Sequence, residues 1–303
     1  MRHPSPPSPP SPHSNRKGYV LLMVLMLLVV ASFLSVGTAR KSIALSRSAA
    51  LGDQELQTRW GRISVRTAVL NRAEILLRSR ELRVGGQVAS METTIRLGGE
   101  QIHLLLSDEQ AKLNVNLIAR QHSLPAVRRS VSRLTEGEFF TNLRPNPSAS
   151  GERTYPPAFD GWGSVYDLSD ILPVHPDDLR FPNRLGKQLT CWGSGSLRLN
   201  RASPAVFREF CELTVSPETA ITLATLRGRN PDWNLEQLLQ GAALSAGERR
   251  ILRRYLTDRS RTHSLWTTVV REQEGDRKKR SWPRLDIVSP EDPTGNTLLV
   301  YEF

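Results

Sequence analysis

The chain has 303 residues, of which 39% are hydrophobic and 23% are charged. Once the first forty residues are set aside, this is the balance of a globular protein, long enough to bury a core as one large domain or two modest ones. The net charge of +11 suggests a nucleic-acid-binding protein, but the arginines are scattered along the chain. The one dense basic run, Arg277 to Arg280, lies between strand-like segments, so we favour a charged hairpin tip over a phosphate or lipid site.

The chain begins with a segment that cannot form a core. Residues Met1 to Lys17 contain a proline-serine tract, Pro4 to Pro12, that has no apolar side chains. The short sequence Arg16-Lys17-Gly18 separates this segment from the apolar run that follows.

A transmembrane helix is predicted over residues 19–36. From Tyr19 to Val36, only Ser32 and Ser35 are polar. At about 1.5 Å per residue this stretch nearly spans a hydrocarbon core of about 30 Å. Basic residues flank it on both sides, so the charge rule for its orientation is weak. A cleaved secretory signal, with its cleavage site within Val36 to Ala39, is the alternative.

The helical pattern continues beyond the apolar run. One amphipathic stripe recurs at steps of four and three: Leu56, Trp60, Ile63, Thr67, Leu70, Glu74 and Leu77. It predicts one long helix from about Tyr19 to about Arg80, with Gly37 or Gly52 as candidate kinks, whose second half packs on a sheet. Two strands follow, Met91 to Leu97 and Gln101 to Leu106, and the glycine pair between them predicts a hairpin. Residues 37–115 thus form a spine helix and the first strands.

Residues 116–260 are expected to form an inserted helical domain, because short helical patterns alternate there with Pro, Gly and Ser. The patterns cover Leu117–Leu134, Ser203–Glu212, Pro217–Arg227, Leu235–Gln240 and Ser245–Asp258. Ser203 and Ser216 each precede a proline, as helix N-caps do, and Ser245 with Glu248 has the spacing of a capping box. Strands return over residues 261–303, at Leu265–Glu272, Arg284–Val288 and Thr297–Phe303.

Three segments resemble one known family. The junction Lys17-Gly18-Tyr19 before an apolar run resembles the leader of a prepilin-like protein. The sequence Asp108-Glu109-Gln110-Ala111-Lys112-Leu113-Asn114-Val115-Asn116 is similar to the Asp-Glu-x-Gly-Lys-(Ile/Leu)-Asn-x-Asn segment of type II secretion K proteins, the large minor pseudopilins, with Ala111 in place of Gly. The segment Gly195 to Pro204 resembles that family's G-x-(I/L)-N-(I/L)-N-T-A-P segment, with Arg198 and Arg201 in place of the first Asn and the Thr and with Asn200 retained.

The resemblance implies an α+β pseudopilin fold, in which a long transmembrane and spine helix packs on an antiparallel sheet that carries a large inserted all-helical domain. It also implies a leader over residues 1–18 that a prepilin peptidase cuts between Gly18 and Tyr19, with methylation of the new N-terminus. The mature protein would be a single-pass inner-membrane protein with a periplasmic C-terminal domain. Its expected partners are smaller minor pseudopilins of the I and J types and the major pseudopilin, at the tip of a pseudopilus that serves protein export.

The position of Met23 bears on where the subunit would lie in a pseudopilus. In most pilins the fifth residue after the cleavage site is Glu, whose carboxylate pairs with the N-terminal amine of a neighbouring subunit. Counted from Tyr19, the fifth residue here is Met23. A thioether cannot neutralise an ammonium group, and an unpaired charge in hydrocarbon is costly. A subunit without this Glu suits the tip, as the K family also lacks it. The alternative is that Met23 is merely an apolar anchor residue.

No motif of an enzyme appears, so no catalytic residue or cofactor is expected. The six histidines are dispersed, and there is no phosphate loop or nucleophile elbow. Four carboxylates raise a calcium hypothesis without an assignable ligand set, and solvated helix ends are the favoured interpretation: Asp167, Asp170, Asp177 and Asp178. Cys191 and Cys211 form a disulfide or are two separately buried thiols, and both alternatives stay open.

The competing function is that of a membrane-anchored helix-hairpin-helix protein that binds nucleic acid. Leu168 to Pro176 and Phe210 to Ala220 resemble such units. A DNA-binding hairpin needs Gly in its turn so that backbone N–H groups can approach a phosphate. Here Pro176 and Pro217 each remove a donor instead. We therefore expect these units to be structural and the chain to have no nucleic-acid partner.

Overall fold

The computed structural model describes residues 15–97, 100–136, 184–272, 278–280, 284–289 and 297–302. By its internal contacts the chain divides into two units, Met1–Trp60 and Gly61–Phe303. Residues 1–14 of the predicted leader 1–18, the four carboxylates of the calcium hypothesis and the hairpin-like segment 168–176 lie outside the described residues.

The described part of the first unit is residues 15–60 of helix α1 (Asn15–Leu70). The last ten residues of this helix belong to the second unit. The segment of α1 that begins at Tyr19 is long and apolar enough to cross a membrane. Every side chain from Tyr19 to Val36 is exposed on the protein, so no core formed by the described residues covers this apolar surface. The helix continues through both candidate kinks, Gly37 and Gly52.

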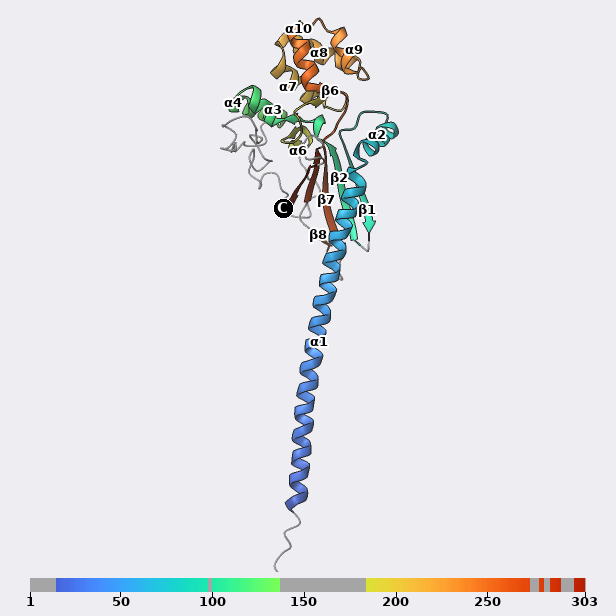
Figure 1. The fold of residues 1–303 in the computed structure, drawn as a ribbon, viewed down its shortest axis with the longest axis vertical. Helices are drawn as coiled ribbons and strands as arrows, with labels where there is room; N and C mark the ends of the chain where they lie inside the picture. Colours follow the sequence, from blue (N-terminus) through green and yellow to red (C-terminus); the bar gives the residue numbers. More distant parts are fainter. Residues whose placement is uncertain are drawn as a thin grey trace, which may run out of the picture. The chain divides into compact units, whose positions relative to one another are not determined.

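The prediction of one helix as far as Arg80 is wrong, because α1 ends at Leu70 and a second helix, α2 (Ala73–Val84), follows (Figure 1). The break lies at Asn71 and Arg72. The Arg72 N–H bonds to Val69 O at 3.1 Å instead of continuing the i→i−4 ladder, and asparagine is a poor helix former. A turn here lets α2 change direction and bury Leu77, which contributes about 1.5–3 kcal/mol.

The expected antiparallel sheet is present. Its order is β1 (Ser90–Leu97), β2 (Glu100–Asp108), β7 (His263–Glu272), β9 (Arg284–Ser289) and β10 (Thr297–Glu302), with β8 (Lys278–Arg280) paired to β7. Strands β1 and β2 pair directly across the predicted hairpin, with Leu97 opposite Glu100. The basic run is strand rather than tip where it is described, because Lys278 lies opposite Glu272 and Arg280 opposite Val270.

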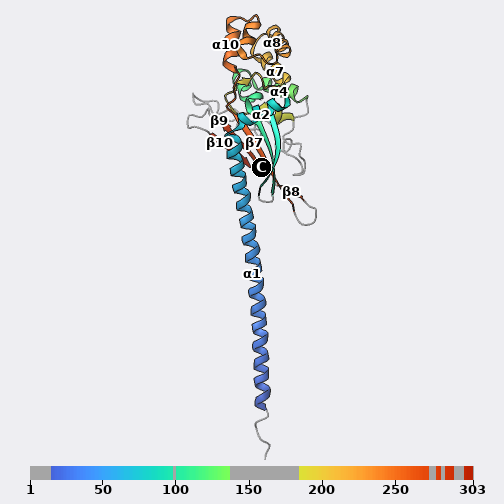
Figure 2. The same cartoon turned by 90° about the vertical axis from the view of Figure 1, so that its right-hand side faces the viewer.

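The two faces of the sheet belong to two hydrophobic cores, because side chains alternate along a strand. One core joins the sheet to the end of α1 and to α2. Both views of the ribbon show the end of α1 running beside the sheet (Figures 1 and 2). Its members are Val65, Leu70, Ala73, Leu77, Ile102, Leu104, Leu106, Leu265 and Val269. The larger core includes Leu105 and Trp266 from the other face and extends through the insertion.

Where it is described, the insertion, with the segment that leads into it, contains helices and two short strand pairs. Its helices are η1 (Glu109–Ala111), α3 (Val115–Gln121), α4 (Leu124–Leu134), α6 (Arg184–Gln188), α7 (Pro204–Thr214), α8 (Pro217–Arg229), α9 (Leu235–Gly241) and α10 (Ala246–Tyr255). Strand β3 (Leu113–Asn114) pairs in parallel with β4 (Leu189–Thr190), and β5 (Leu197–Arg198) with β6 (Leu256–Thr257). These pairs refine the expected all-helical insertion, since two-residue strands leave no periodic pattern in a sequence.

The predicted helix starts are confirmed. Ser203 and Ser216 accept hydrogen bonds from the N–H groups of Val206 and Thr219, and Ser245 with Glu248 forms a complete capping box. A further capping box, Asn234 with Gln237, begins α9. The turn between α7 and α8 therefore contains Ser216, the N-cap of α8.

Candidate functional site

The two segments that resemble family motifs meet at the end of strand β2. Asp108, the last residue of β2, has a fully buried carboxylate. Its Oδ1 accepts the N–H of Gln110 at 3.0 Å, which caps η1, and the Ser260 hydroxyl at 2.5 Å. Its Oδ2 accepts hydrogen bonds from Arg198 at 3.3 Å and from Arg201 at 3.1 Å. One carboxylate thus joins the sheet to both arginines of the second segment.

The same two arginines also hold helix α2. Arg198 donates to both oxygens of Glu74, at 2.8 and 3.0 Å, in the bidentate geometry that suits a guanidinium. Arg201 donates to both oxygens of Glu81, at 2.6 and 3.1 Å, and from Nη1 to Glu74 at 2.8 Å. We call these five residues the arginine–carboxylate cluster. It ties α2, β2 and the insertion together.

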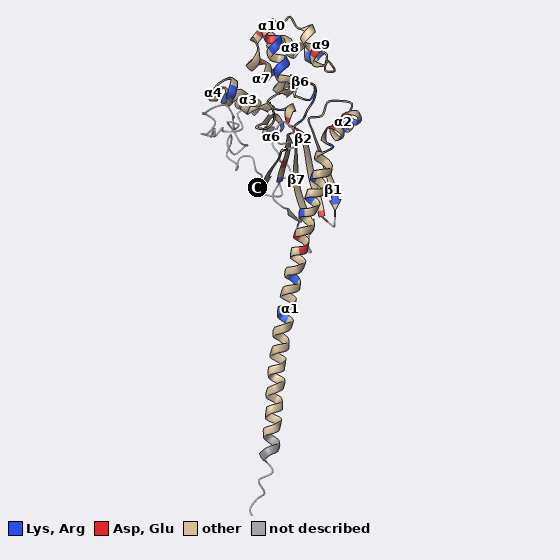
Figure 3. Cartoon of the chain, viewed as in Figure 1, with Lys and Arg blue, Asp and Glu red and all other residues tan. Residues whose placement is uncertain are grey.

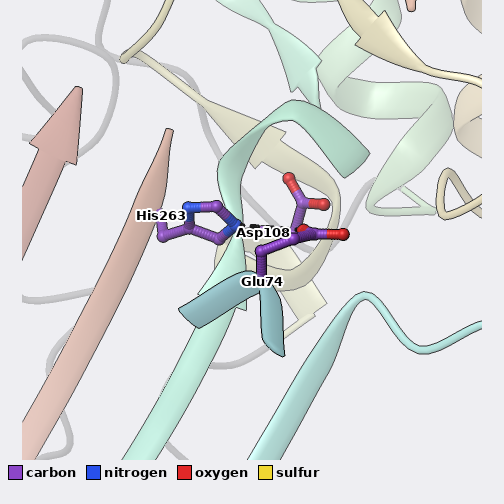
Figure 4. Close-up of side chains that lie close together, drawn as sticks. All are labelled: Glu74, Asp108 and His263. Carbon is purple, nitrogen blue, oxygen red and sulfur yellow. Dashed lines mark ion pairs between the residues drawn. The ribbon is translucent and has the colours of Figure 1, made fainter. Parts of the chain in front are cut away.

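His263 lies at the edge of the cluster. Figure 4 shows its ring pointing toward Glu74 and Asp108, and its Nε2 lies 3.6 Å from Glu74 Oε2. One ligand atom from each of these three residues falls within 4.8 Å of the others, a spacing that a metal ion could bridge. The carboxylate oxygens already accept hydrogen bonds from two guanidinium groups, however, so protein cations occupy the positions that a metal would need. The cluster does not fit a metal site.

The electrostatics of the cluster favour the charged forms of Glu74 and Arg201. Burial disfavours ionised Glu74, but the His263 ring and the two guanidinium groups outweigh burial and hold the pKa of Glu74 well below its usual range. Burial likewise disfavours a charged Arg201, whereas its carboxylate partners outweigh that effect and raise its pKa above the ordinary value. Glu74 and Arg201 therefore stay ionised at neutral pH.

A second buried ion pair follows directly in the first motif segment. Lys112 Nζ lies 2.5 Å from Glu109 Oε1, and both side chains are almost completely buried. Ser264 of β7 donates its hydroxyl to the same oxygen, and the Glu109 N–H bonds to Thr262 O at 3.0 Å. Glu109, paired with Lys112, thus connects the start of the insertion to strand β7.

Two of the three motif asparagines bond to the backbone at element junctions. Asn114 Oδ1 accepts the Leu117 N–H at 3.0 Å and caps α3, while its Nδ2 donates to Trp192 O at 2.8 Å. Asn116 Nδ2 donates to Cys191 O at 2.6 Å. Asn200 differs, because its Oδ1 is buried without a hydrogen-bond partner among the described residues.

These contacts predict unequal effects of alanine substitution. Asn116→Ala is expected to lower the free energy of unfolding by about 1–3 kcal/mol, because it removes a donor to a buried carbonyl. Asn200→Ala is expected to change it by less than about 0.5 kcal/mol, since its Oδ1 makes no bond to lose. Thermal unfolding of both full-length variants in detergent measures the difference. Equal destabilisation by the two substitutions would contradict the assignment.

The other predicted residues are placed as follows. Tyr19 and Met23 are exposed on α1, in the same unit as Gly18. Cys191 and Cys211 are both buried thiols, which matches the alternative of two separately buried groups. Burial raises the pKa of Cys211 to about 12, so its thiol is unreactive at neutral pH.

Sequence reasoning missed the arginine–carboxylate cluster. Glu74 was grouped with an apolar stripe, and Arg198 and Arg201 were noted only as departures from a family pattern. A usable signal was present: two acids spaced seven positions apart on one helix face, Glu74 and Glu81, with two arginines spaced three apart elsewhere. No local sequence pattern indicates that these acids pair with these arginines, because 120 to 127 positions separate the partners.

The sequence matches no family model and no curated protein. Among solved structures, the chain is similar to one chain of the crystal structure of the GspK–GspI–GspJ complex from the enterotoxigenic Escherichia coli Type 2 Secretion System. The two chains share 13% sequence identity, the match covers 83% of this chain and 99% of that chain, and the TM-score is 0.43. The function proposed below therefore rests on this chain's own residues.

Proposed function

We propose that this chain is a K-type minor pseudopilin at the tip of a type II secretion pseudopilus, where it assists assembly and protein export. The observation that carries the proposal is the meeting of the two motif-like segments. Asp108 of the first accepts hydrogen bonds from Arg198 and Arg201 of the second, across 90 and 93 positions of sequence. Two segments that resemble one family in order thus form one junction between sheet and insertion.

The proposed setting is the inner membrane, with α1 as a single-pass anchor and residues 61–303 in the periplasm. The exposed apolar surface from Tyr19 to Val36 supports an anchor, since hydrocarbon would cover it. Partners in this setting are minor pseudopilins of the I and J types, the major pseudopilin and the prepilin peptidase. The proposal gives the chain no enzymatic activity, no cofactor and no nucleic-acid partner.

Processing tests the proposal directly. The mature protein is expected to begin at Tyr19, because the junction Lys17-Gly18-Tyr19 directly precedes the apolar run. N-terminal sequencing, with mass analysis for methylation, checks this. Gly18→Val should leave the precursor uncut, whereas the matched variant Gly37→Val, at a position with open space around it, should be processed normally. A mature terminus near Arg40 would indicate a secretory signal and remove the proposal.

The tip position is the finer part of the proposal. Met23 provides no carboxylate for the terminal amine of a subunit above it. The insertion adds a second reason, because its bulk, repeated along a tightly packed filament, would clash. Both features suit a subunit above which nothing follows.

A capping subunit predicts one copy per pseudopilus and a modest effect of Met23→Glu. The new carboxylate would take up a proton in hydrocarbon, so secretion should fall only partly while cleavage stays normal. Quantitative crosslinking of intact pseudopili measures the copy number, with Met26→Glu as the variant at a neighbouring exposed anchor position. Many copies along the filament, or full secretion after deletion of the gene, would exclude the tip assignment.

A further inference from the structure

Helix α2 has two faces of different character. Its inner face buries Ala73 and Leu77 and presents Glu74 and Glu81 to the arginine–carboxylate cluster. Its outer face carries Ile75 and Leu82, which are 65% and 81% exposed. The spacing of seven residues places these two aliphatic side chains on the same side of the helix, two turns apart.

The charges of α2 are also segregated. Both of its acids point to the cluster, whereas Arg78, Arg80 and Arg83 are exposed. None of these arginines forms an ion pair with a described residue, and Arg83 Nε bonds only within its helix, to Ser79 O at 3.3 Å. Figure 3 shows the basic residues on α2. The outer face is therefore an aliphatic pair bordered by two cations, Arg78 and Arg83, that lack carboxylate partners in the described chain.

We propose that the outer face of α2, defined by Ile75, Arg78, Leu82 and Arg83, is a docking surface for an acidic amphipathic segment of a neighbouring pseudopilus subunit. The proposal rests on the proposed function, which supplies such neighbours. Aliphatic side chains two turns apart match the apolar stripe of a partner helix, and the bordering arginines match acidic residues beside that stripe.

A lipid surface is the less suitable occupant. Helices that lie in a membrane interface carry a broad apolar face with aromatic or many leucine side chains. The twelve residues of α2 contain no aromatic residue, and Leu76 and Leu77 face the protein. The outer face itself carries two exposed aliphatic residues with flanking arginines, which fit a narrow protein contact better. The cluster contributes rigidity, because both acids of α2 are held by guanidinium groups.

Site-specific photocrosslinking in the full-length protein tests the surface. A photoreactive phenylalanine replaces Leu82 in cells that express the complete secretion gene cluster, and mass spectrometry identifies the crosslinked peptide. The matched control position is Ile221 of α8, which is 61% exposed. The expected product at Leu82 is an acidic amphipathic peptide of another subunit that has a prepilin-like leader, with no such product at Ile221. Products with lipid or this chain's own peptides only, or no product, would overturn the proposal.

Charge reversal separates docking from mere proximity. Arg78→Glu combined with Arg83→Glu is expected to lower the yield of that product about ten-fold, because attraction becomes repulsion. The matched double variant, Arg128→Glu with Arg129→Glu on the exposed side of α4, should leave the yield unchanged. An unchanged yield in the first double variant would refute electrostatic recognition by α2.

The two hypotheses fail in different ways. A mature protein that begins at Tyr19 but gives no crosslink at Leu82 would overturn the docking surface and leave the pseudopilin role. A charge-dependent crosslink to a protein without a prepilin-like leader, together with a mature terminus elsewhere, would overturn the proposed function and the assignment of its neighbour as a pseudopilus subunit.

Discussion

Arg201→Ala is expected to lower the free energy of unfolding by about 3–5 kcal/mol, because removing one partner of a buried ion pair leaves uncompensated charge. The Arg201 side chain is fully buried and contacts three carboxylates, of which Asp108 is fully buried as well. Without the guanidinium group, Asp108 keeps Arg198, but Glu81 loses its cation in the described structure. Both the sheet end and α2 would be weakened.

Two further substitutions test whether the loss of stability comes from the buried ion pairs. Arg201→Lys keeps the charge but not the forked geometry that reaches two carboxylates, so its effect should be intermediate. Arg208→Ala removes an arginine that is 67% exposed and pairs with Glu212, and it should change stability by less than about 1 kcal/mol. Urea unfolding of the full-length variants in detergent, followed by tryptophan fluorescence, measures all three. Equal effects of the two alanine substitutions would contradict a structural role of the cluster.

The same cluster predicts how stability depends on pH. The folded-state pKa of Glu74 is lowered from its ordinary value of 4.5, so its contribution is fully present above that value. As the pH falls below about 4.5, the unfolded chain takes up the proton first, and the contribution is progressively lost. The difference in unfolding free energy between the native chain and Arg201→Ala should therefore be largest near pH 7 and shrink toward pH 3. A constant difference over this range would exclude the ionised cluster as its source.

Lys112→Met is expected to lower the free energy of unfolding by about 3–5 kcal/mol, because it also removes one partner of a buried ion pair. It leaves the Glu109 carboxylate, which is fully buried, without its cation. The double variant Glu109→Gln with Lys112→Met should recover much of the loss, because two neutral side chains need no charge compensation. The matched exposed pair is Glu236 with Arg253, each more than half exposed, where Arg253→Met should cost less than about 1 kcal/mol.

The unfolding free energies of these variants decide between two explanations of the pair. If the double variant is no more stable than Lys112→Met, the shape of the lysine side chain matters and its charge does not. If it is clearly more stable, buried charge compensation holds the start of the insertion against β7.

Local physical chemistry made a large part of this fold predictable. The hairpin of β1 and β2 follows from alternating apolar residues around two glycines, and the starts of α7, α8 and α10 follow from Ser203, Ser216 and Ser245. In each case the residues that carry the signal are close in sequence and act on their own backbone, so no distant contact is needed to interpret them. The apolar run from Tyr19 is predictable for the same reason.

Only the tertiary structure decided where the spine helix ends and what the motif-like segments do. The stripe through Leu70, Glu74 and Leu77 fits one continuous helix, whereas in the structure the chain turns at Asn71 and α2 packs on the sheet. Arg198 and Arg201 could not be assigned from sequence because their carboxylate partners lie 90 to 127 positions away. Propensity and capping act over a few residues, whereas burial and ion pairing depend on which distant groups the fold brings together.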